Sequence, residues 1–94
     1  MDIICINDTF SPEQIAVIPN RPQRDKMYTI RDIVKSSMGV GLLLNEIHNP
    51  HNGWAEMNGT KFTFEPNFNI NRFANMHGDM LTYEMIREEI TVKA

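Results

Sequence analysis

Short stretches of this chain alternate between hydrophobic and polar residues, and this pattern predicts a fold built mainly from β-strands. Residues 3–6, IICI, form a continuous apolar run that is typical of a strand covered on both faces. Residues 28–34 and 40–47 carry two further strand patterns, and the turn sequence SSMG between them predicts a β-hairpin. We expect these three segments to belong to one strongly bent antiparallel sheet.

The alternation within the second strand breaks at one point. Tyr28 and Ile30 lie on the same side of the strand, but Asp32 occupies the next position of that parity and Ile33 takes its place. A bulge of one residue at Arg31 and Asp32 restores the register. We therefore predict a β-bulge within this strand.

The centre of the chain combines turn signals with weaker strand signals. Residues 48–60, HNPHNGWAEMNGT, are predicted to be a loop or a weak strand, with turns at Asn52-Gly53 and Asn58-Gly59. Residues 61–64, KFTF, alternate again and predict another strand. A connection as long as residues 48–60 is unusual in a compact domain, and long ordered loops are often functional.

The run NFNIN at residues 67–71 places asparagines in strict alternation with two hydrophobic residues. Phe68 and Ile70 lie on one side of this segment and the asparagines on the other. Because asparagine is a poor strand former, we expect a short, strained or edge segment here. A tight turn after it would return Phe73 to the core.

Helix signals appear near the N-terminus. Residues 10–15 read FSPEQI, in which Ser11 can cap a helix, Pro12 suits its first position and Gln14 completes a capping box. Pro19 then limits the helix to a turn or two. The prediction is a short N-terminal helical turn.

A second helix is predicted near the C-terminus. Residues 80–90, MLTYEMIREEI, offer Thr82 as a cap, a hydrophobic pair at Leu81 and Ile86, and an apolar stripe. We expect a short amphipathic helix, followed by a tail or a last pairing segment at residues 91–94. The chain contains seven methionines, and Met76, Met80 and Met85 are expected to fill the core rather than to line a groove.

Length and composition predict a single domain over residues 1–94. Ninety-four residues cannot be divided between two cores. No apolar run approaches the roughly 18 residues that cross a bilayer, and the N-terminus MDIICIND lacks the pattern of a signal peptide. The single cysteine, Cys5, cannot form an internal disulfide, which is typical of a reducing compartment. A cytoplasmic protein is therefore predicted.

The formal charge of −3 argues against the strong nonspecific phosphate binding of a basic domain. Charge is nevertheless unevenly distributed, because one segment holds five of the nine basic residues: Arg21, Arg24, Lys26, Arg31 and Lys35. The simplest interpretation is a solvated face. Nucleic-acid binding through this segment is the alternative, helped by bases stacking on Phe62, Phe64, Phe68 and Phe73, although these rings are expected to fill the core.

The order of these motifs resembles small SH3-like β-barrel proteins of unassigned function from bacteria and their phages. The matching pieces are CIND after the first strand, KMYTIRDI, GLLLNEI, and FNINRF near the end, where such barrels place a tight turn before a last short strand. The resemblance covers residues 3–73 and leaves the C-terminal helix outside. It implies a small SH3-like, strongly bent antiparallel barrel with a noncatalytic role, and it implies no functional residues.

No catalytic constellation stands out. The sequence lacks the G-x-S-x-G, H-E-x-x-H and phosphate-cradling motifs. Cys5 lies in an apolar strand, where a thiol is usually an inert packing group. His48 and His51 have a spacing that binds metal on a helix, which Pro50 disfavours. We therefore expect no enzyme activity, no cofactor and no metal site.

By elimination, we expect a noncatalytic binding module for a protein partner, an accessory factor of a phage or other mobile element. The candidate partner-binding residues are Trp54, His51, Asn69, Asn71 and Arg72. Trp54 is the only tryptophan of the chain, and tryptophan is enriched among the residues that dominate interface energies. Its ring has an alternative use as a lid on an open end of the barrel. Small-nucleotide binding at a site between subunits is a further alternative, since one subunit of this size can scarcely enclose a pocket.

Overall fold

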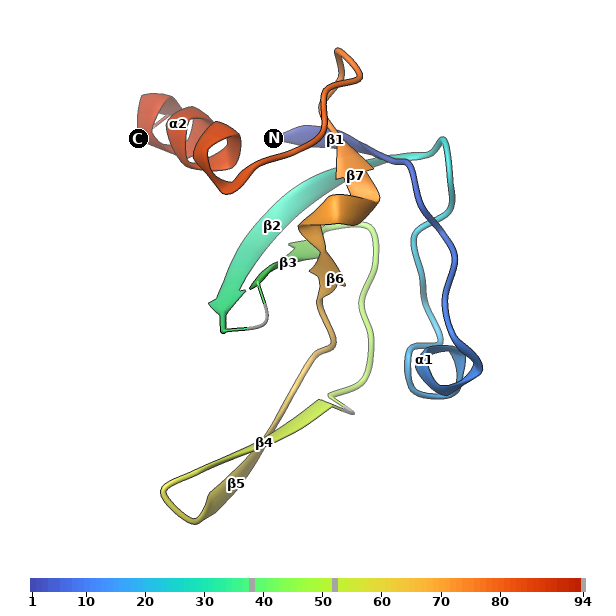
Figure 1. Ribbon diagram of the computed structural model, residues 1–94, viewed down its shortest axis with the longest axis vertical. Helices are drawn as coiled ribbons and strands as arrows, with labels where there is room; N and C mark the ends of the chain where they lie inside the picture. Colours follow the sequence, from blue (N-terminus) through green and yellow to red (C-terminus); the bar gives the residue numbers. More distant parts are fainter. Residues whose placement is uncertain (38, 52, 94) are drawn as a thin grey trace.

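The computed structural model describes residues 1–37, 39–51 and 53–93, and for residues 53–57, 62 and 89–93 it describes the backbone alone. Figure 1 shows a curved main sheet, a hairpin that projects from it, and two short helices. The elements in chain order are β1 (Asp2–Cys5), α1 (Pro12–Val17), β2 (Met27–Ser36), β3 (Gly39–Leu44), β4 (Gly53–Met57), β5 (Thr60–Phe64), β6 (Phe68–Asn69), the 3₁₀ helix η1 (Ile70–Arg72), β7 (Phe73–Ala74) and α2 (Tyr83–Lys93).

The main sheet has five strands in the order β6-β3-β2-β1-β7, and neighbouring strands are antiparallel. β2 is the longest strand and curves visibly, so that its first residues pair with β1 and the remainder with β3 (Figure 1). Ile3 pairs with Tyr28, and Ile33 pairs with Leu42. The prediction that these three strands share one antiparallel sheet is confirmed.

The predicted bulge in β2 is also confirmed. Ile30 pairs with Leu44, but Asp32 pairs with Leu43, so Arg31 is the extra residue between two successive pairs. A bulge bends the strand that carries it and redirects a side chain. Here it lets the Arg31 Nε–H donate to the backbone carbonyl of Leu44 at 2.9 Å, while the same guanidinium reaches across to Glu65.

The prediction of a mainly β fold with an antiparallel sheet and two short helices is confirmed, while the sheet is open rather than closed into a barrel, with β6 and β7 as its two edges. The two edge strands have two residues each and are joined by η1. Asn69 starts that turn, since its side-chain oxygen accepts a hydrogen bond from the backbone N–H of Asn71 at 2.8 Å. An asparagine that bonds the backbone two residues further on favours a turn over an extended strand.

The core packs on one face of the main sheet, and α2 contributes Ile86 to it. Its buried hydrophobic residues are Ile3, Cys5, Ile18, Tyr28, Leu42, Leu44, Ile47, Phe68, Ile70, Phe73, Leu81 and Ile86. The expectation that Phe68 and Phe73 fill the interior is confirmed. It is wrong for Phe64, which is 38% exposed because it ends the projecting hairpin, and the side chain of Phe62 lies outside the described residues.

Both helices begin as predicted. In α1 the Ser11 hydroxyl accepts from the Gln14 amide and the Gln14 side chain accepts from the Ser11 amide, which completes the capping box. The Thr82 hydroxyl accepts from the Met85 amide at 3.3 Å and starts α2. Leu81 and Ile86 are both buried beside that cap, in agreement with the expected pair. α2 continues to Lys93, however, so residues 91–93 are helical rather than a tail or a pairing segment.

One glycine explains the role of the first asparagine in NFNIN. Gly41 is buried on β3, and a Cβ atom at this position would overlap the side chain of Asn67. Replacing Gly41 by alanine is therefore expected to destabilise the protein by about 1 to 2 kcal/mol, because the Asn67 side chain must leave its place. Urea unfolding measures this loss. Adding Asn67→Ala to Gly41→Ala should restore part of it, and an equal loss in both backgrounds would contradict this contact.

Candidate functional site

The β4–β5 hairpin is a two-stranded sheet separate from the main sheet. It projects away from the rest of the protein in Figure 1. Asn58 and Gly59 form its turn with φ angles of 53° and 80°, which confirms the turn predicted there. The other predicted turn includes Asn52, which lies outside the described residues. Residues 53–57 form the strand β4, so the segment 48–60 is not one long loop.

Two of the candidate partner-binding residues belong to this hairpin region. His51 is exposed and precedes β4. Trp54 lies on β4 and pairs with Thr63 of β5, while its side chain lies outside the described residues. Gly53 pairs with Phe64, whose ring is partly exposed where the hairpin leaves the body. Whether Trp54 anchors a partner or covers the core stays a prediction.

The carboxylate of Glu65 holds the base of the hairpin. One guanidinium nitrogen of Arg31, Nη2, donates to both oxygens of Glu65 at 2.7 and 2.8 Å. The backbone N–H of Asn49 donates to the same carboxylate at 3.0 Å. Because residue 49 precedes β4 and residue 65 follows β5, this carboxylate joins both ends of the hairpin to the bulge in β2. We call Asn20, Arg31, Asn49 and Glu65 the hairpin base.

Asn49 extends the hairpin base to the loop that follows α1. Its side-chain oxygen accepts a hydrogen bond from the backbone N–H of Asn20 at 2.9 Å, and its side-chain nitrogen donates to the backbone carbonyl of Asn20 at 2.8 Å. Asn49 is 7% exposed, so both polar atoms of this nearly buried amide have partners. No feature of the sequence predicted this network, because its members are up to 45 positions apart (Asn20 to Glu65).

The remaining candidate partner-binding residues lie together in the turn between β6 and β7. Asn69 and Asn71 form the start of η1. Arg72 donates from Nη1 to the Thr9 carbonyl at 2.7 Å, and its guanidinium lies 3.9 Å from the centre of the Phe10 ring. Arg72 therefore holds the N-terminal loop in place. The five predicted residues are divided between the hairpin and this turn.

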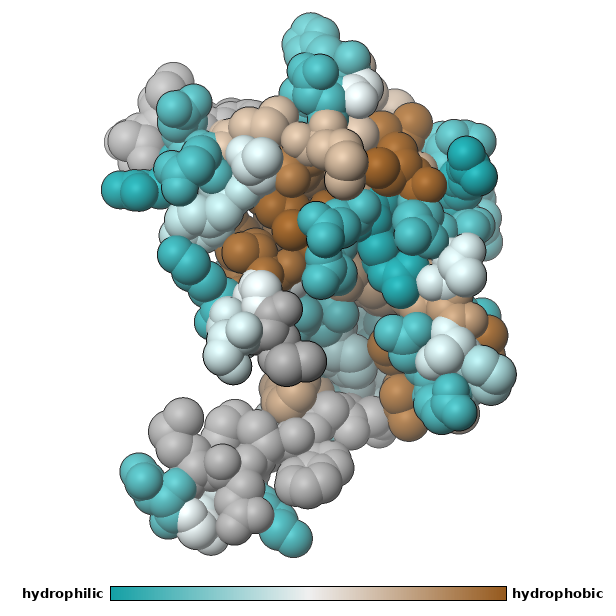
Figure 2. Space-filling view, in the orientation of Figure 1, coloured by the Kyte–Doolittle hydropathy of each residue, from teal (hydrophilic) through white to brown (hydrophobic). Residues whose placement is uncertain are grey.

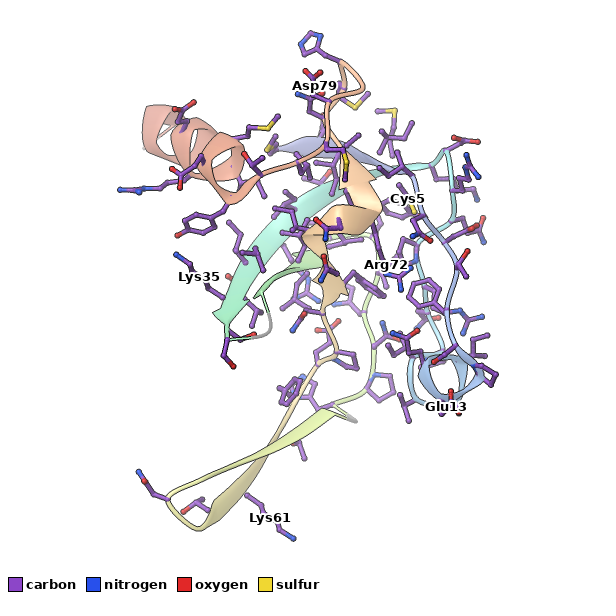
Figure 3. The ribbon with its side chains drawn as sticks, in the orientation of Figure 1. Cys5, Glu13, Lys35, Lys61, Arg72 and Asp79 are labelled. Atoms are coloured by element: carbon purple, nitrogen blue, oxygen red, sulfur yellow. The ribbon has the colours of Figure 1, made fainter. Side chains whose placement is uncertain are left out.

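Basic side chains of the nucleic-acid alternative are spread along β2 and the loop before it: Arg21, Arg24, Lys26, Arg31 and Lys35. Arg31 is held in the hairpin base, and the Lys35 ammonium lies 4.2 Å from the centre of the Tyr83 ring. The Arg21 guanidinium donates to the Ile18 carbonyl at 2.8 Å. Figure 3 shows Lys35 near the far end of β2, whereas Arg21 and Arg24 lie in the loop before this strand. Nucleic-acid binding stays a prediction.

An apolar strip crosses the outer face of the sheet. Met27 pairs with Ile4, Ile4 with Ala74, and Ala74 with Met80, so these residues form one row across neighbouring strands. Met27, Met76 and Met80 are exposed to 57%, 50% and 56%. Figure 2 shows tan and brown surface over β1 and β7. The expectation that Met76 and Met80 fill the core is wrong, because the segment that carries them lies outside the edge strand β7.

Chemically reactive groups are sparse among the described residues. Burial raises the pKa of the Cys5 thiol above its ordinary value, so this cysteine is a protonated packing group at neutral pH. Within the described ranges, no three His, Cys, Asp or Glu side chains are arranged to hold a metal ion. None of the helices in that part of the chain is long and apolar enough to span a membrane.

Comparison with known proteins gives no match to a family model, to a curated protein or to a solved structure. The resemblance to SH3-like proteins therefore stays a prediction, and the candidate site is described by its own geometry. That geometry is a projecting hairpin held by a network of hydrogen bonds at its base.

Proposed function

We propose that this protein is a noncatalytic binding module whose β4–β5 hairpin docks onto a protein partner. One observation carries the proposal, namely that the hairpin forms its own two-stranded sheet and extends away from the main sheet (Figure 1). A two-stranded hairpin is at best marginally stable in water, and three strands or packing against another element are needed for stability. A partner that adds a strand or covers one face would supply what the hairpin lacks.

The composition of the hairpin supports a protein partner. Its residues 53–64, GWAEMNGTKFTF, include one acidic and one basic residue together with Trp54, Phe62 and Phe64. Aromatic residues are enriched at the centres of protein interfaces, where charged residues are depleted. A neutral aromatic hairpin suits a protein surface better than a nucleic-acid backbone, which attracts positive charge.

Rigid support at the hairpin base favours binding. The ion pair between Arg31 and Glu65 is largely shielded from water, with the two side chains 24% and 11% exposed. The orientation of the Arg31 guanidinium is fixed, because Nε–H donates to the Leu44 carbonyl while Nη2 donates to both oxygens of Glu65. A docking element held in one orientation loses little conformational entropy when a partner binds.

We further propose that the protein is an SH3-like module of a phage or other mobile element and acts in the cytoplasm. The order of CIND, KMYTIRDI, GLLLNEI and FNINRF supports it, together with a 3₁₀ turn directly before the last short strand of the sheet. The single cysteine is free and buried, which suits a reducing compartment.

Replacing Trp54 by alanine tests the proposal. We expect the melting temperature to stay nearly unchanged and partner binding to weaken by about 2 kcal/mol or more. An interface anchor contributes free energy to the complex and not to the fold of the free protein. The partner is first captured from a lysate of the source organism with the parent protein, then purified for calorimetric titration with both variants.

The matched control is Ile15→Ala, which removes an exposed apolar side chain from α1 instead of the hairpin. It should leave binding unchanged. Normal partner binding by Trp54→Ala, combined with a loss of about 3 kcal/mol or more of stability, would place the ring in the core and refute the docking role of the hairpin.

A further inference from the structure

The hairpin base connects the hairpin to the loop between α1 and β2, residues 18–26. The Asn49 side chain bonds both the N–H and the C=O group of the Asn20 backbone. In return, the Asn20 side chain donates to the backbone carbonyl of His48 at 2.7 Å. Three hydrogen bonds therefore hold the first part of this loop against the segment that enters β4.

Burial of Asn49 makes this network open or close as a whole. Asn49 is 7% exposed, and its backbone N–H and its side chain have their partners in Glu65 and Asn20. A separation too small to admit water would leave these groups unpaired, which costs the full desolvation penalty of each group. Among the described residues, no buried side-chain nitrogen or oxygen lacks a partner. The network therefore has two favourable states, one fully bonded and one fully hydrated.

Pairing of β4 with β5 depends on the same network. Within the described ranges, no strand of the main sheet pairs with β4 or β5, and each of these two strands has only five residues. A two-stranded hairpin is at best marginally stable alone. Asn49 and Glu65 hold the two ends of the hairpin together, which lowers the entropy lost when its strands pair. An open network therefore favours an unpaired hairpin, and an unpaired hairpin favours an open network.

The second part of the loop is attached to the main sheet instead. The backbone N–H of Asp25 donates to the carbonyl of Cys5 in β1 at 2.8 Å. The backbone N–H of Gln23 donates to the hydroxyl of Tyr28, a core residue of β2, also at 2.8 Å. Segments held by core strands open only at high free energy, whereas segments with few buried apolar contacts open more easily. A boundary between two units therefore falls within this loop, between Asn20 and Gln23.

We propose that the hairpin and the Asn20 segment, residues 19–21, form one conformational unit that opens and closes as a whole while the main sheet stays folded. The core on that sheet includes Ile3, Leu42 and Phe73, which take no part in the network. Coupling of this kind is reciprocal, so whatever stabilises the paired hairpin also stabilises the Asn20 segment. A protein bound to the hairpin would thereby hold this segment in its closed state. The inference concerns the free protein and does not depend on such a partner.

Native-state hydrogen exchange, followed residue by residue by NMR, tests this coupling. In the parent protein, the Asn20 amide and the protected amides of β4 and β5 should share one protection factor, below that of the Asp25 amide. Gly59→Ala strains the distant turn of the hairpin, where φ is 80°. It should lower the protection of the hairpin and of Asn20 by the same factor, about fivefold or more. In the reverse direction, Asn20→Ala removes the bond to His48 and should lower the protection of the hairpin by about fivefold.

The matched control is Gly78→Ala, which introduces similar strain at a φ of 87° in the loop between β7 and α2, outside the proposed unit. This strain is present whether the unit is closed or open, so the protection of Asn20 and of the hairpin should match the parent. Unchanged protection of Asn20 in Gly59→Ala, or of the hairpin in Asn20→Ala, would show two independent segments and overturn the inference. A loss at Asn20 in Gly78→Ala would also overturn it, because Asn20 would then open only when the whole protein unfolds.

Discussion

Replacing Phe73 by alanine is expected to destabilise the protein by about 3 to 5 kcal/mol. Phe73 is fully buried, and it is the largest of the completely buried side chains of the described core. Its backbone pairs with Cys5 of β1 and accepts a hydrogen bond from Leu81, so the chain cannot easily move into the space that the ring leaves. Cavities that cannot collapse lie at the costly end of the range for core truncations.

Chemical denaturation measures this loss, and each kcal/mol corresponds to a fall of about 4 to 8 °C in the melting temperature of a domain of this size. Since small domains are stable by about 5 to 15 kcal/mol, the variant would lose a large part of its stability. Phe64→Ala is the matched control, because it removes the same ring from a partly exposed position and should cost clearly less. Similar losses for Phe64 and Phe73 would contradict the assigned core.

Replacing Glu65 by alanine should cost about 3 kcal/mol, the second largest effect that we expect. The substitution removes both hydrogen bonds from Arg31 and the one from the Asn49 amide. Removing one member of a shielded ion pair leaves the other without its partner, and this is more costly than the net value of the pair itself. Hydrogen exchange should become faster in β4 and β5, because both ends of the hairpin depend on this carboxylate.

Two further variants separate the role of the charge from a general effect of substitution. Glu65→Gln keeps the shape of the side chain and should lose less than the alanine variant. Glu88→Ala removes an exposed glutamate of α2 and should leave stability and exchange nearly unchanged. Unaltered hairpin exchange in Glu65→Ala would show that the hairpin base does not hold the hairpin.

Lowering the pH should weaken the hydrogen bonds and the ion pair of the hairpin base. Burial acts to raise the pKa of Glu65, but the hydrogen bond from Asn49 and the contacts with Arg31 outweigh it, so the pKa lies below its ordinary value. A depressed carboxyl pKa contributes stability above the unfolded-state pKa, about 4.3, and this contribution is lost as the pH falls through the folded-state value. Stability measured against pH should therefore decline below about pH 4.3, and less steeply in Glu65→Gln.

The sequence predicted an element correctly where the interactions that form this element are between residues close in the chain. Ser11 and Gln14 form their capping box in α1, and the Asn58-Gly59 turn forms as expected. The bulge at Arg31 followed from a break in a period-two pattern, since one extra residue is the only way to keep both halves of β2 facing the core. The short edge segment at NFNIN followed from the poor strand preference of asparagine.

Tertiary structure alone decided whether the sheet closes and where the candidate site lies. Closure depends on whether two edge strands meet, and strand patterns describe each strand without its neighbours. The same limitation placed Met80 in the predicted core, although its pairing with Ala74 leaves it on the outer face. The hairpin base joins Asn20, Arg31 and Glu65, which are distant in the chain. Hydrogen bonds between distant segments leave no periodic pattern in a sequence, so only the folded chain reveals them.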